Sequence, residues 1–443
     1  MDLAGQRVMV IGLGVSGRAA ARLAAAHGAR LTMADARADL PREGLPAGEL
    51  RLGPEDPAWL DGVQLAIASP GVPPSSPLMR AARAARIPLI GELEFGARFI
   101  SAPIAAVTGS NGKSTVTVML GGILRAAGRR VFVGGNLGTP IAEAADGNFD
   151  AAVIEASSYQ LELIESFRPR VAVHLNLTED HLDRYRDLAE YGRAKARIFE
   201  FQEAADCAVL NRDDAHVWRL NESVRARVFS FGHERPAPPS AAAAIWPERG
   251  GLAWRYRGAE GRIDLARFRS GGRHNLANAM AAAAAGLAMG ADAAAIEAAL
   301  AAFRGLAHRL EFVAEKRGVR YVDDSKGTNV GAAVEALNAV GAPVILIAGG
   351  VDKGGDYAPL KAALGERARL AILIGAAREK LRAALAGAVA IELAPALGEA
   401  VRIAAERARP GDTVLLSPAC SSFDQFKDYA ERGRIFQELV RAL

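Results

Sequence analysis

The chain has 443 residues, which is too long for one hydrophobic core, so we expect about three domains. Half of its residues are hydrophobic and only 6% are aromatic, a composition typical of an α/β enzyme. The formal net charge of +4 is spread along the chain, without a dense basic run or basic residues interleaved with aromatic ones, which argues against nucleic-acid binding.

The two cysteines, Cys207 and Cys420, form neither a metal-binding spacing nor a disulfide framework, so we expect free thiols in a reducing compartment. The first residues do not combine a basic segment with a long apolar core, and no stretch reaches about 18 uninterrupted apolar residues. We therefore expect a cytoplasmic protein without a membrane segment.

The N-terminal region begins with an apolar run, RVMVIG, which predicts a β-strand and leads directly into the sequence GLGVSG. Its glycines, Gly12, Gly14 and Gly17, have the G-x-G-x-x-G spacing of a phosphate-binding turn at a helix N-terminus. A second strand-like run, ARLTMAD, ends at Asp35, where a Rossmann acid would meet a ribose hydroxyl. Taken alone, this pattern favours a nicotinamide-dependent dehydrogenase.

A phosphate loop follows in the sequence VTGSNGKST, between an apolar strand and a predicted helix. Gly109 and Gly112 would let backbone amides converge on a polyphosphate, Lys113 would supply a cation, and Ser114 or Thr115 would supply a hydroxyl for magnesium. The strict P-loop pattern requires a glycine where this chain has Val107, so the loop is a variant. Hydride transfer has no use for a second loop of this kind, and the two glycine motifs together favour an ATP-driven reaction on a substrate that carries a nucleotide or phosphate.

Two candidate metal-binding segments follow the phosphate loop. The strand-like run AAVIE ends at Glu155, where an acid beside a phosphate loop would hold magnesium. The sequence NLTEDHLDRY surrounds His181 with acids, which fits a second metal, although a structural, ion-paired histidine is the alternative.

The rest of the chain indicates a further α/β unit. Residues 233–262 are rich in Pro, Ala and Gly and predict a peripheral hairpin or loop, and residues 275–290 predict a helix ending at Gly290. Four more strand candidates follow: VRYVDDS, PVILIAGG, LAILIGAA and DTVLLSPA. We therefore predict an α/β protein of three domains: a Rossmann-like domain over 1–92, a central P-loop ATPase-like parallel-sheet domain over 93–305, and a C-terminal Rossmann-like domain over 306–443.

Seven motifs occur in the order found in the Mur ligases, so the chain resembles this family over essentially its whole length: TGSNGKST, NLTEDHLDRY, YGRAKARIF, GRHNLANAMAA, AHRLEFV, DDSKGTN and LLSPACSSFDQFKDYAERG. The GLGVSG opening and the closing segment are most similar to the glutamate-adding members. Folylpolyglutamate synthases share the middle and last domains but not the first domain or the ending.

The resemblance implies an ATP-dependent ligase of cytoplasmic peptidoglycan precursor synthesis. It would phosphorylate the carboxylate of UDP-N-acetylmuramoyl-L-alanine, and the amino group of D-glutamate would attack the acyl phosphate. L-glutamate or another amino acid is the alternative that the sequence leaves open. ATP and two Mg²⁺ sites are implied, in a monomer without nucleic-acid or membrane partners.

The resemblance also implies roles for single residues. The ATP-binding residues would be Gly109, Ser110, Asn111, Gly112, Lys113, Ser114, Thr115, Asn278, Arg309 and Asp324. The catalytic residues would be Lys113, Glu155, His181 and Lys195. Ser114 and Glu155 resemble ligands of the first magnesium, and His181 and Lys195 those of the second. Lys195 would act as a carbamate, because an ammonium cannot coordinate a cation whereas its carbon dioxide adduct is a carboxylate.

The resemblance also implies residues for two substrate-binding sites. The glutamate-binding residues would be His181, Lys326, Thr328, Lys353, Ser422 and Phe423, and the alternation of Asp352 and Lys353 leaves their roles open. The UDP-substrate residues would be Gly14, Val15, Ser16, Asp35, Arg37, Gly71 and Asn136, so the GLGVSG loop would bind the UDP pyrophosphate in place of NAD. A nicotinamide oxidoreductase leaves the phosphate loop unexplained, and a non-catalytic nucleotide-binding regulator leaves Glu155, His181 and Lys195 without a role.

Overall fold

A computed structural model describes residues 1–236, 243–269 and 272–443, so part of the Pro- and Ala-rich region lies outside the described residues. The chain forms two compact units. The first comprises residues 1–176, 192–268 and 277–302. The second comprises residues 177–191, 269–276 and 303–443.

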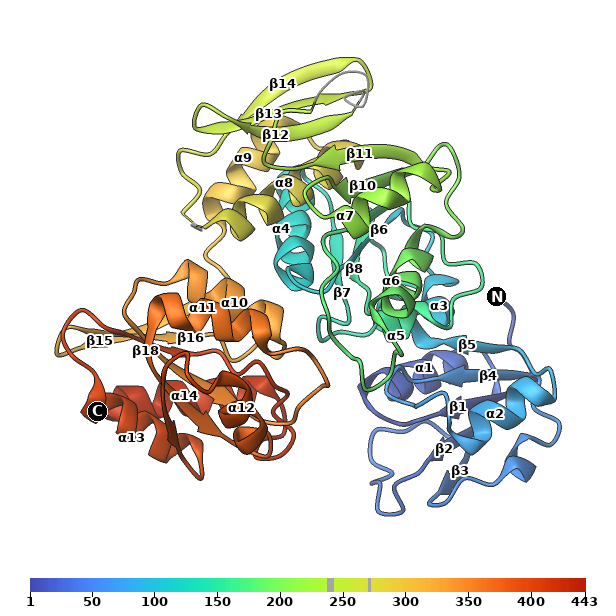
Figure 1. The fold of residues 1–443 in the computed structure, drawn as a ribbon. Helices are drawn as coiled ribbons and strands as arrows, with labels where there is room; N and C mark the ends of the chain where they lie inside the picture. Colours follow the sequence, from blue (N-terminus) through green and yellow to red (C-terminus); the bar gives the residue numbers. More distant parts are fainter. Residues whose placement is uncertain (237–242, 270–271) are drawn as a thin grey trace. The chain divides into compact units, whose positions relative to one another are not determined.

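The N-terminal part of the first unit is a parallel five-stranded sheet of order β3-β2-β1-β4-β5 (Figure 1). Its strands are β1 (Arg7–Ile11), β2 (Arg30–Asp35), β3 (Glu49–Leu52), β4 (Leu65–Ala68) and β5 (Leu89–Gly91). Its helices are α1 (Val15–Ala26), η1 (Pro57–Leu60), α2 (Pro77–Ala84) and α3 (Glu92–Ala97). Successive side chains of β1 pack on opposite faces, Val10 with Ala20 of α1 and Met9 with Met79 of α2. Both faces are therefore covered, which explains the continuous apolar run.

The central sheet has nine strands in the order β14-β13-β12-β11-β10-β9-β6-β8-β7. The strands are β6 (Ile104–Thr108), β7 (Val131–Gly135), β8 (Ala151–Glu155), β9 (Val171–His174), β10 (Cys207–Asn211), β11 (Arg227–Phe231), β12 (Ala244–Glu248), β13 (Gly251–Tyr256) and β14 (Ala259–Asp264). All neighbouring strands are parallel except β12–β13 and β13–β14, which form the predicted peripheral hairpin.

The helices of the central region are α4 (Lys113–Ala126), η2 (Ile141–Ala144), α5 (Ser158–Leu161), α6 (Leu188–Ala196), η3 (Arg197–Phe199), α7 (Ala215–Trp218), η4 (Arg219–Glu222), α8 (Arg273–Ala288) and α9 (Ala293–Ala302). Helix α4 follows the phosphate loop and packs on β6, β7 and β8 and against α9. The predicted Ala-rich helix is confirmed as α8, and Gly290 just after it has a φ of +86°.

The C-terminal sheet has six strands in the order β15-β16-β20-β17-β18-β19, and only β15 is antiparallel to its neighbour. The strands are β15 (Glu311–Lys316), β16 (Val319–Asp323), β17 (Val344–Gly349), β18 (Ala368–Ile374), β19 (Ala390–Leu393) and β20 (Thr413–Leu416). The helices are α10 (Val330–Ala339), α11 (Ala358–Arg367), α12 (Arg378–Leu385), α13 (Leu397–Arg407) and α14 (Tyr429–Ala442). Leu346 packs with α10–α12 and Ile347 with α13 and α14.

The predicted α/β class with parallel sheets in the N-terminal, central and C-terminal regions is confirmed. In the part of the chain that the structure describes, none of the helices combines the length and the apolar composition that spanning a bilayer requires.

Candidate active site

The phosphate loop connects β6 to α4, and its two glycines adopt backbone angles that favour glycine. Gly109 has a φ of +150°, and Gly112, the N-cap of α4, has a φ of +84°. A Cβ atom on Gly112 would lie 2.4 Å from Oδ1 of Asn278. Gly112 has no side chain that could cap α4, and the helix begins directly after the loop, which is the position of an anion site at a helix N-terminus.

A hydroxyl and a carboxylate meet beside this loop. The Ser114 hydroxyl donates to Oε2 of Glu155 at 2.6 Å. Glu155 ends β8, is 2% exposed and pairs in register with Val107 of β6. Lys113 Nζ donates to the carbonyl oxygens of Gly109 and Ser110, both at 2.8 Å. Because Mg²⁺ prefers oxygen ligands next to phosphate oxygens, this donor set fits the predicted first magnesium site.

Two more predicted residues lie at this site, one in contact with Glu155 and the other with the phosphate loop. The Asn136 amide donates to Oε1 of Glu155 at 2.6 Å, so both oxygens of this carboxylate are held. Lys195 is only 1% exposed, and its Nζ donates to the Gly109 carbonyl oxygen at 2.8 Å. Lys195 is therefore a buried lysine directed at the phosphate loop.

The second compact unit brings several predicted glutamate-binding residues together around Asp180. The Asp180 carboxylate accepts hydrogen bonds from the backbone N–H of His181 at 2.9 Å and from the Asn329 side-chain amide at 3.0 Å. It also forms an ion pair with Lys353 Nζ at 3.3 Å. Lys353 Nζ also donates to the Thr328 hydroxyl at 3.4 Å. His181 belongs to this unit whereas Glu155 and Lys195 belong to the first, so its part in the metal set stays a prediction.

The structure distinguishes Asp352 from Lys353, which the sequence could not. Asp352 accepts the Tyr357 hydroxyl at 2.7 Å and pairs with Lys380, whereas Lys353 faces Asp180. Lys353 is therefore the residue of this pair that points to the predicted glutamate site.

The remaining predicted glutamate-binding residues lie in the same unit. Ser422 is 3% exposed and Phe423 is 74% exposed, an unusual exposure for a large apolar side chain. Lys326 Nζ lies 5.2 Å from the centre of the Tyr429 ring, within cation–π range.

Arg309 and Asp324, predicted to bind ATP, also lie close to each other in the second unit. Asp324 accepts the Ser417 hydroxyl at 2.7 Å and the backbone N–H of Leu310 at 3.3 Å. Burial raises the pKa of Asp324 to about 7, although the Arg309 charge and these hydrogen bonds oppose the shift. Arg309 Nε is buried and has no hydrogen-bond partner among the described residues, which fits a guanidinium that awaits a ligand.

The glycine loop of the first domain has the close packing that its glycines predict. A Cβ on Gly17 would lie 1.8 Å from the carbonyl oxygen of Gly12, so only glycine fits there. Gly14 is the N-cap of α1, whose start carries no cap from the described side chains, and Val15 is 68% exposed. Gly71 has open surroundings, since a Cβ atom there would meet no described atom within 4 Å beyond its chain neighbours. The loop therefore offers backbone N–H groups to an anion.

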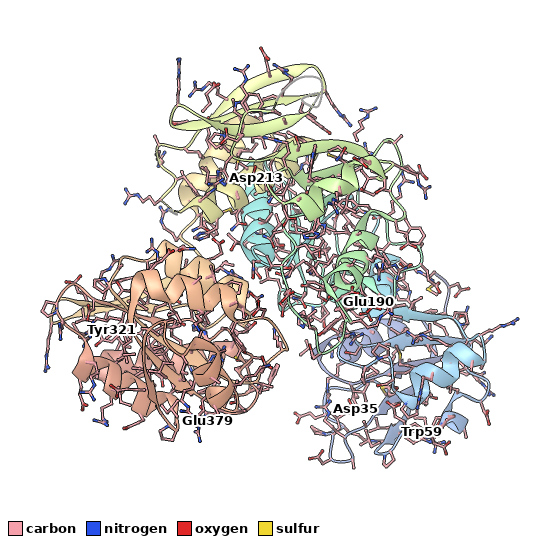
Figure 2. All side chains as sticks on the ribbon, viewed as in Figure 1. Asp35, Trp59, Glu190, Asp213, Tyr321 and Glu379 are labelled. Carbon is pink, nitrogen blue, oxygen red and sulfur yellow. The ribbon has the colours of Figure 1, made fainter. Side chains whose placement is uncertain are left out.

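Asp35, labelled in Figure 2, ends β2. Its hydrogen bonds connect this loop to Arg37. Its carboxylate accepts the Leu13 backbone N–H at 2.7 Å and two guanidinium hydrogen bonds from Arg37, both at 2.9 Å. Burial alone would raise the pKa of Asp35, but these bonds lower it to about 2. Asp35 is therefore a carboxylate at neutral pH, and it is fixed to the predicted UDP-binding loop.

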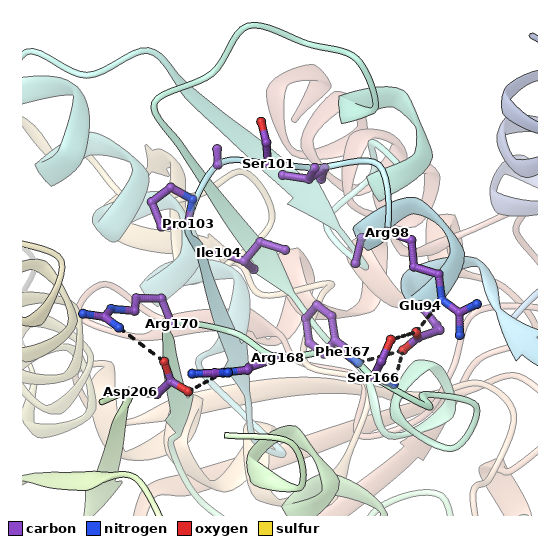
Figure 3. A pocket seen from close by; sticks show the side chains of 13 residues that line it. Glu94, Arg98, Ser101, Pro103, Ile104, Ser166, Phe167, Arg168, Arg170 and Asp206 are labelled. Atoms are coloured by element: carbon purple, nitrogen blue, oxygen red, sulfur yellow. Dashed lines mark hydrogen bonds and ion pairs between the residues drawn. The ribbon is translucent and has the colours of Figure 1, made fainter. Parts of the chain in front are cut away.

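A pocket of about 470 Å³ opens near the start of β6 (Figure 3). The phosphate loop follows the other end of that strand. Its charged side chains are paired with one another: Arg98 with Glu94 at 2.8 Å, and Arg168 with Asp206 at 2.7 Å. The described residues that line it include none of the predicted site residues.

Sequence reasoning missed three polar residues that support the site. Asp180 and Asn329 form the contacts described above, and Asn176 accepts the Asn111 backbone N–H at 2.8 Å through its side chain. Asp180 and Asn329 lie inside the motifs NLTEDHLDRY and DDSKGTN, next to residues that were singled out. Position within a motif was therefore the available signal.

Three family descriptions match consecutive parts of the chain: "Mur ligase MurD-like, N-terminal domain" over 6–91, "Mur ligase middle domain" over 107–286 and "Mur ligase, glutamate ligase domain" over 308–420. The UDP-N-acetylmuramoylalanine–D-glutamate ligase of Geobacter metallireducens is 46% identical, with 100% of this chain and 99% of that protein covered. Other relatives with this name are 43 to 47% identical over at least 99% of the chain.

Solved structures show the same fold at lower identity. A pseudomurein peptide ligase type C from Methanothermus fervidus superposes with a TM-score of 0.62 at 20% identity, covering 99% of this chain and 100% of that one. The MurF ligase of Thermotoga maritima, solved in complex with ADP, superposes with a TM-score of 0.60 at 18% identity, covering 100% and 96%.

Proposed function

Because the chain belongs to the Mur ligase family, we propose that it joins D-glutamate to UDP-N-acetylmuramoyl-L-alanine with ATP as the energy source, in peptidoglycan precursor synthesis. The observation that carries this proposal is the 46% identity, over the whole chain, with a ligase named for this reaction. The relatives are named for D-glutamate, so L-glutamate is not favoured.

The first step is phosphoryl transfer from ATP to the substrate carboxylate. We assign the triphosphate to the loop 109–115 and its neutralisation to Lys113; Asn278, Arg309 and Asp324 would hold the rest of the nucleotide. Ser114 and Glu155 would hold one Mg²⁺, and His181 with carbamylated Lys195 a second. When bound, Mg²⁺ would supply positive charge at the phosphate oxygens. The Ser114–Glu155 hydrogen bond and the buried position of Lys195 support this assignment.

The second step is amide formation. The glutamate amino group attacks the carbonyl carbon of the acyl phosphate, the tetrahedral intermediate releases phosphate, and the nitrogen loses a proton. Glutamate carries two carboxylates, which need cations to hold them, and Lys326 and Lys353 are the candidates. His181, Thr328, Ser422 and Phe423 would complete this site.

The UDP part of the other substrate would bind at the glycine loop of the first domain. The candidate residues are Gly14, Val15, Ser16, Asp35, Arg37, Gly71 and Asn136. The uncapped start of α1 suits a pyrophosphate, and the Asp35 carboxylate suits a uracil or ribose donor.

We also propose domains over 1–92, 93–305 and 306–443, a monomer, and a cytoplasmic location without nucleic-acid or membrane partners. The two buried cysteines, which are free thiols, suit a reducing compartment.

The deciding experiment is phosphate release with ATP, Mg²⁺ and UDP-N-acetylmuramoyl-L-alanine, with D-glutamate, L-glutamate, meso-diaminopimelate or L-lysine as the amino acid. We expect turnover with D-glutamate alone, and a loss of at least about 10³-fold for Lys113→Met because the phosphate charge is no longer neutralised. A preference for another amino acid would contradict the glutamate assignments while leaving the ATP site intact. No phosphate release with any of the four would overturn the proposal.

A further inference from the structure

Two neighbouring loops carry the proposed glutamate-binding residues of the C-terminal domain. Residues 350–356 follow β17 and contain Lys353, and residues 417–423 follow β20 and contain Ser422. Strands β17 and β20 are parallel neighbours, so both loops leave the same edge of the sheet. Backbone hydrogen bonds join them, from Val351 N to Ser421 O at 2.9 Å and from Ser421 N to Val351 O at 3.0 Å.

One buried tyrosine contacts both loops through its hydroxyl. Tyr357, the N-cap of α11, is 5% exposed. Its hydroxyl donates to Oδ1 of Asp352 at 2.7 Å, and the same oxygen lies 3.4 Å from Sγ of Cys420, which is fully buried. Asp352 directly precedes Lys353, and Cys420 lies two residues before Ser422. The hydroxyl is therefore a side-chain link between the two loops.

The protonation states set the direction of these hydrogen bonds. Burial raises the pKa of the Tyr357 hydroxyl well above its usual range and that of the Cys420 thiol to about 11, so both groups keep their protons at neutral pH. Burial would raise the pKa of Asp352, but hydrogen bonds from Lys380 and Tyr357 lower it. The tyrosine proton goes to the Asp352 carboxylate, which leaves the phenol oxygen to accept the thiol proton of Cys420.

We propose that Tyr357 is a positioning residue for the amino-acid substrate: its hydroxyl holds the loop of Lys353 and the loop of Ser422 in one fixed arrangement around glutamate. This inference rests on the proposed assignment of Lys353 and Ser422 to glutamate. Tyr357 is not among the residues proposed to bind glutamate, ATP or the UDP substrate. A phenylalanine would fill nearly the same volume as Tyr357, so packing does not require the hydroxyl. The hydrogen bonds of this hydroxyl with Asp352 and Cys420 are the evidence that it links the two loops.

The test is Tyr357→Phe, which removes the link and keeps the ring. We expect the KM for D-glutamate to rise about tenfold, the size of one lost hydrogen bond to a charged group, with the KM values for ATP and UDP-N-acetylmuramoyl-L-alanine within about twofold of wild type. Tyr256→Phe is the matched control, because Tyr256 is also a buried tyrosine but lies on β13 in the first unit. It should leave all three KM values unchanged.

A second pair of variants approaches the link from its other end. Cys420→Ser keeps a donor for the phenol oxygen and should behave as wild type, whereas Cys420→Ala should raise the KM for D-glutamate and add little to Tyr357→Phe in the double variant. Lys353→Met tests the underlying assignment: if it leaves this KM unchanged, the proposed glutamate site fails. If Lys353→Met raises it and Tyr357→Phe does not, or if all three KM values rise together, the positioning role alone is overturned.

Discussion

Both oxygens of the Glu155 carboxylate accept hydrogen bonds, and the two donor residues were predicted to bind different ligands. Ser114 donates to one oxygen and Asn136 to the other, both at 2.6 Å. The sequence resemblance assigns Asn136 to the UDP substrate, whereas its side chain here fixes the orientation of a proposed magnesium ligand. Groups that orient a metal ligand change metal affinity when they are removed.

Asn136→Ala should therefore raise the Mg²⁺ concentration needed for half-maximal velocity, by about tenfold. The measurement is an initial-rate Mg²⁺ titration with the three substrates saturating. Asn148→Ala is the control, since the Asn148 side chain accepts a hydrogen bond from Arg130 at an exposed position. A rise in the KM for UDP-N-acetylmuramoyl-L-alanine with an unchanged Mg²⁺ requirement would show that Asn136 acts only on the substrate.

Helix α3 carries two buried acids in opposite surroundings. Glu94 accepts the backbone N–H groups of residues 165–167 and a guanidinium bond from Arg98. Burial would raise its pKa, but these bonds and the Ser166 hydroxyl lower it. The Glu92 side chain accepts the Ala142 N–H on one oxygen, and its Oε2 has no hydrogen-bond partner among the described residues. Burial raises the pKa of Glu92 to about 7.

The pKa of Glu92 gives a prediction of pH-dependent stability. A carboxyl whose pKa is about 7 when folded and 4.5 when unfolded destabilises the fold as pH rises from about 4.5 through 7. Wild type should lose roughly 2 to 3 kcal/mol of unfolding free energy from this group between pH 5 and pH 8, and Glu92→Gln should remove that loss. Denaturant unfolding at both pH values measures it.

Glu94→Gln is the matched control on the same helix. A lowered pKa contributes stability that is present above the unfolded pKa and lost only in acid, so this variant should be destabilised by about 3 kcal/mol equally at pH 5 and pH 8. Parallel pH dependence in wild type and Glu92→Gln would mean that Glu92 titrates normally.

The elements differ in how well the sequence predicts them. Strands β1, β17 and β20 are buried on both faces and consist mainly of apolar residues, and these three were identified from the sequence. Strands β15 (EFVAEK) and β19 (AIEL) lie at the edges of their sheet, and charged residues bound or interrupt their short apolar stretches, so no long apolar run marked them. The site residues came from motifs, whereas the contact of Asp180 with Lys353 joins residues 173 positions apart and needs the fold.

At the scale of the whole molecule, the candidate residues for the three substrates are distributed differently between the two compact units. The UDP-substrate residues all lie in the first unit and the glutamate residues all lie in the second. The ATP residues are divided, with Lys113 and Asn278 in the first unit and Arg309 and Asp324 in the second. ATP is therefore the proposed ligand whose candidate residues come from both units.

Amide hydrogen exchange tests the assignment of ATP-binding residues to both units. A non-hydrolysable ATP analogue at about 100 times its Kd contributes roughly 2.7 kcal/mol to the states that bind it, so exchange should slow in α4 of the first unit and in β16 of the second. UDP-N-acetylmuramoyl-L-alanine, as the control ligand, should slow exchange around β1 and α1 and leave β16 unchanged. Protection by the analogue in α4 alone would remove Arg309 and Asp324 from the ATP site. Protection in both units would support the assignment of Lys113 and Asn278 together with Arg309 and Asp324 to ATP.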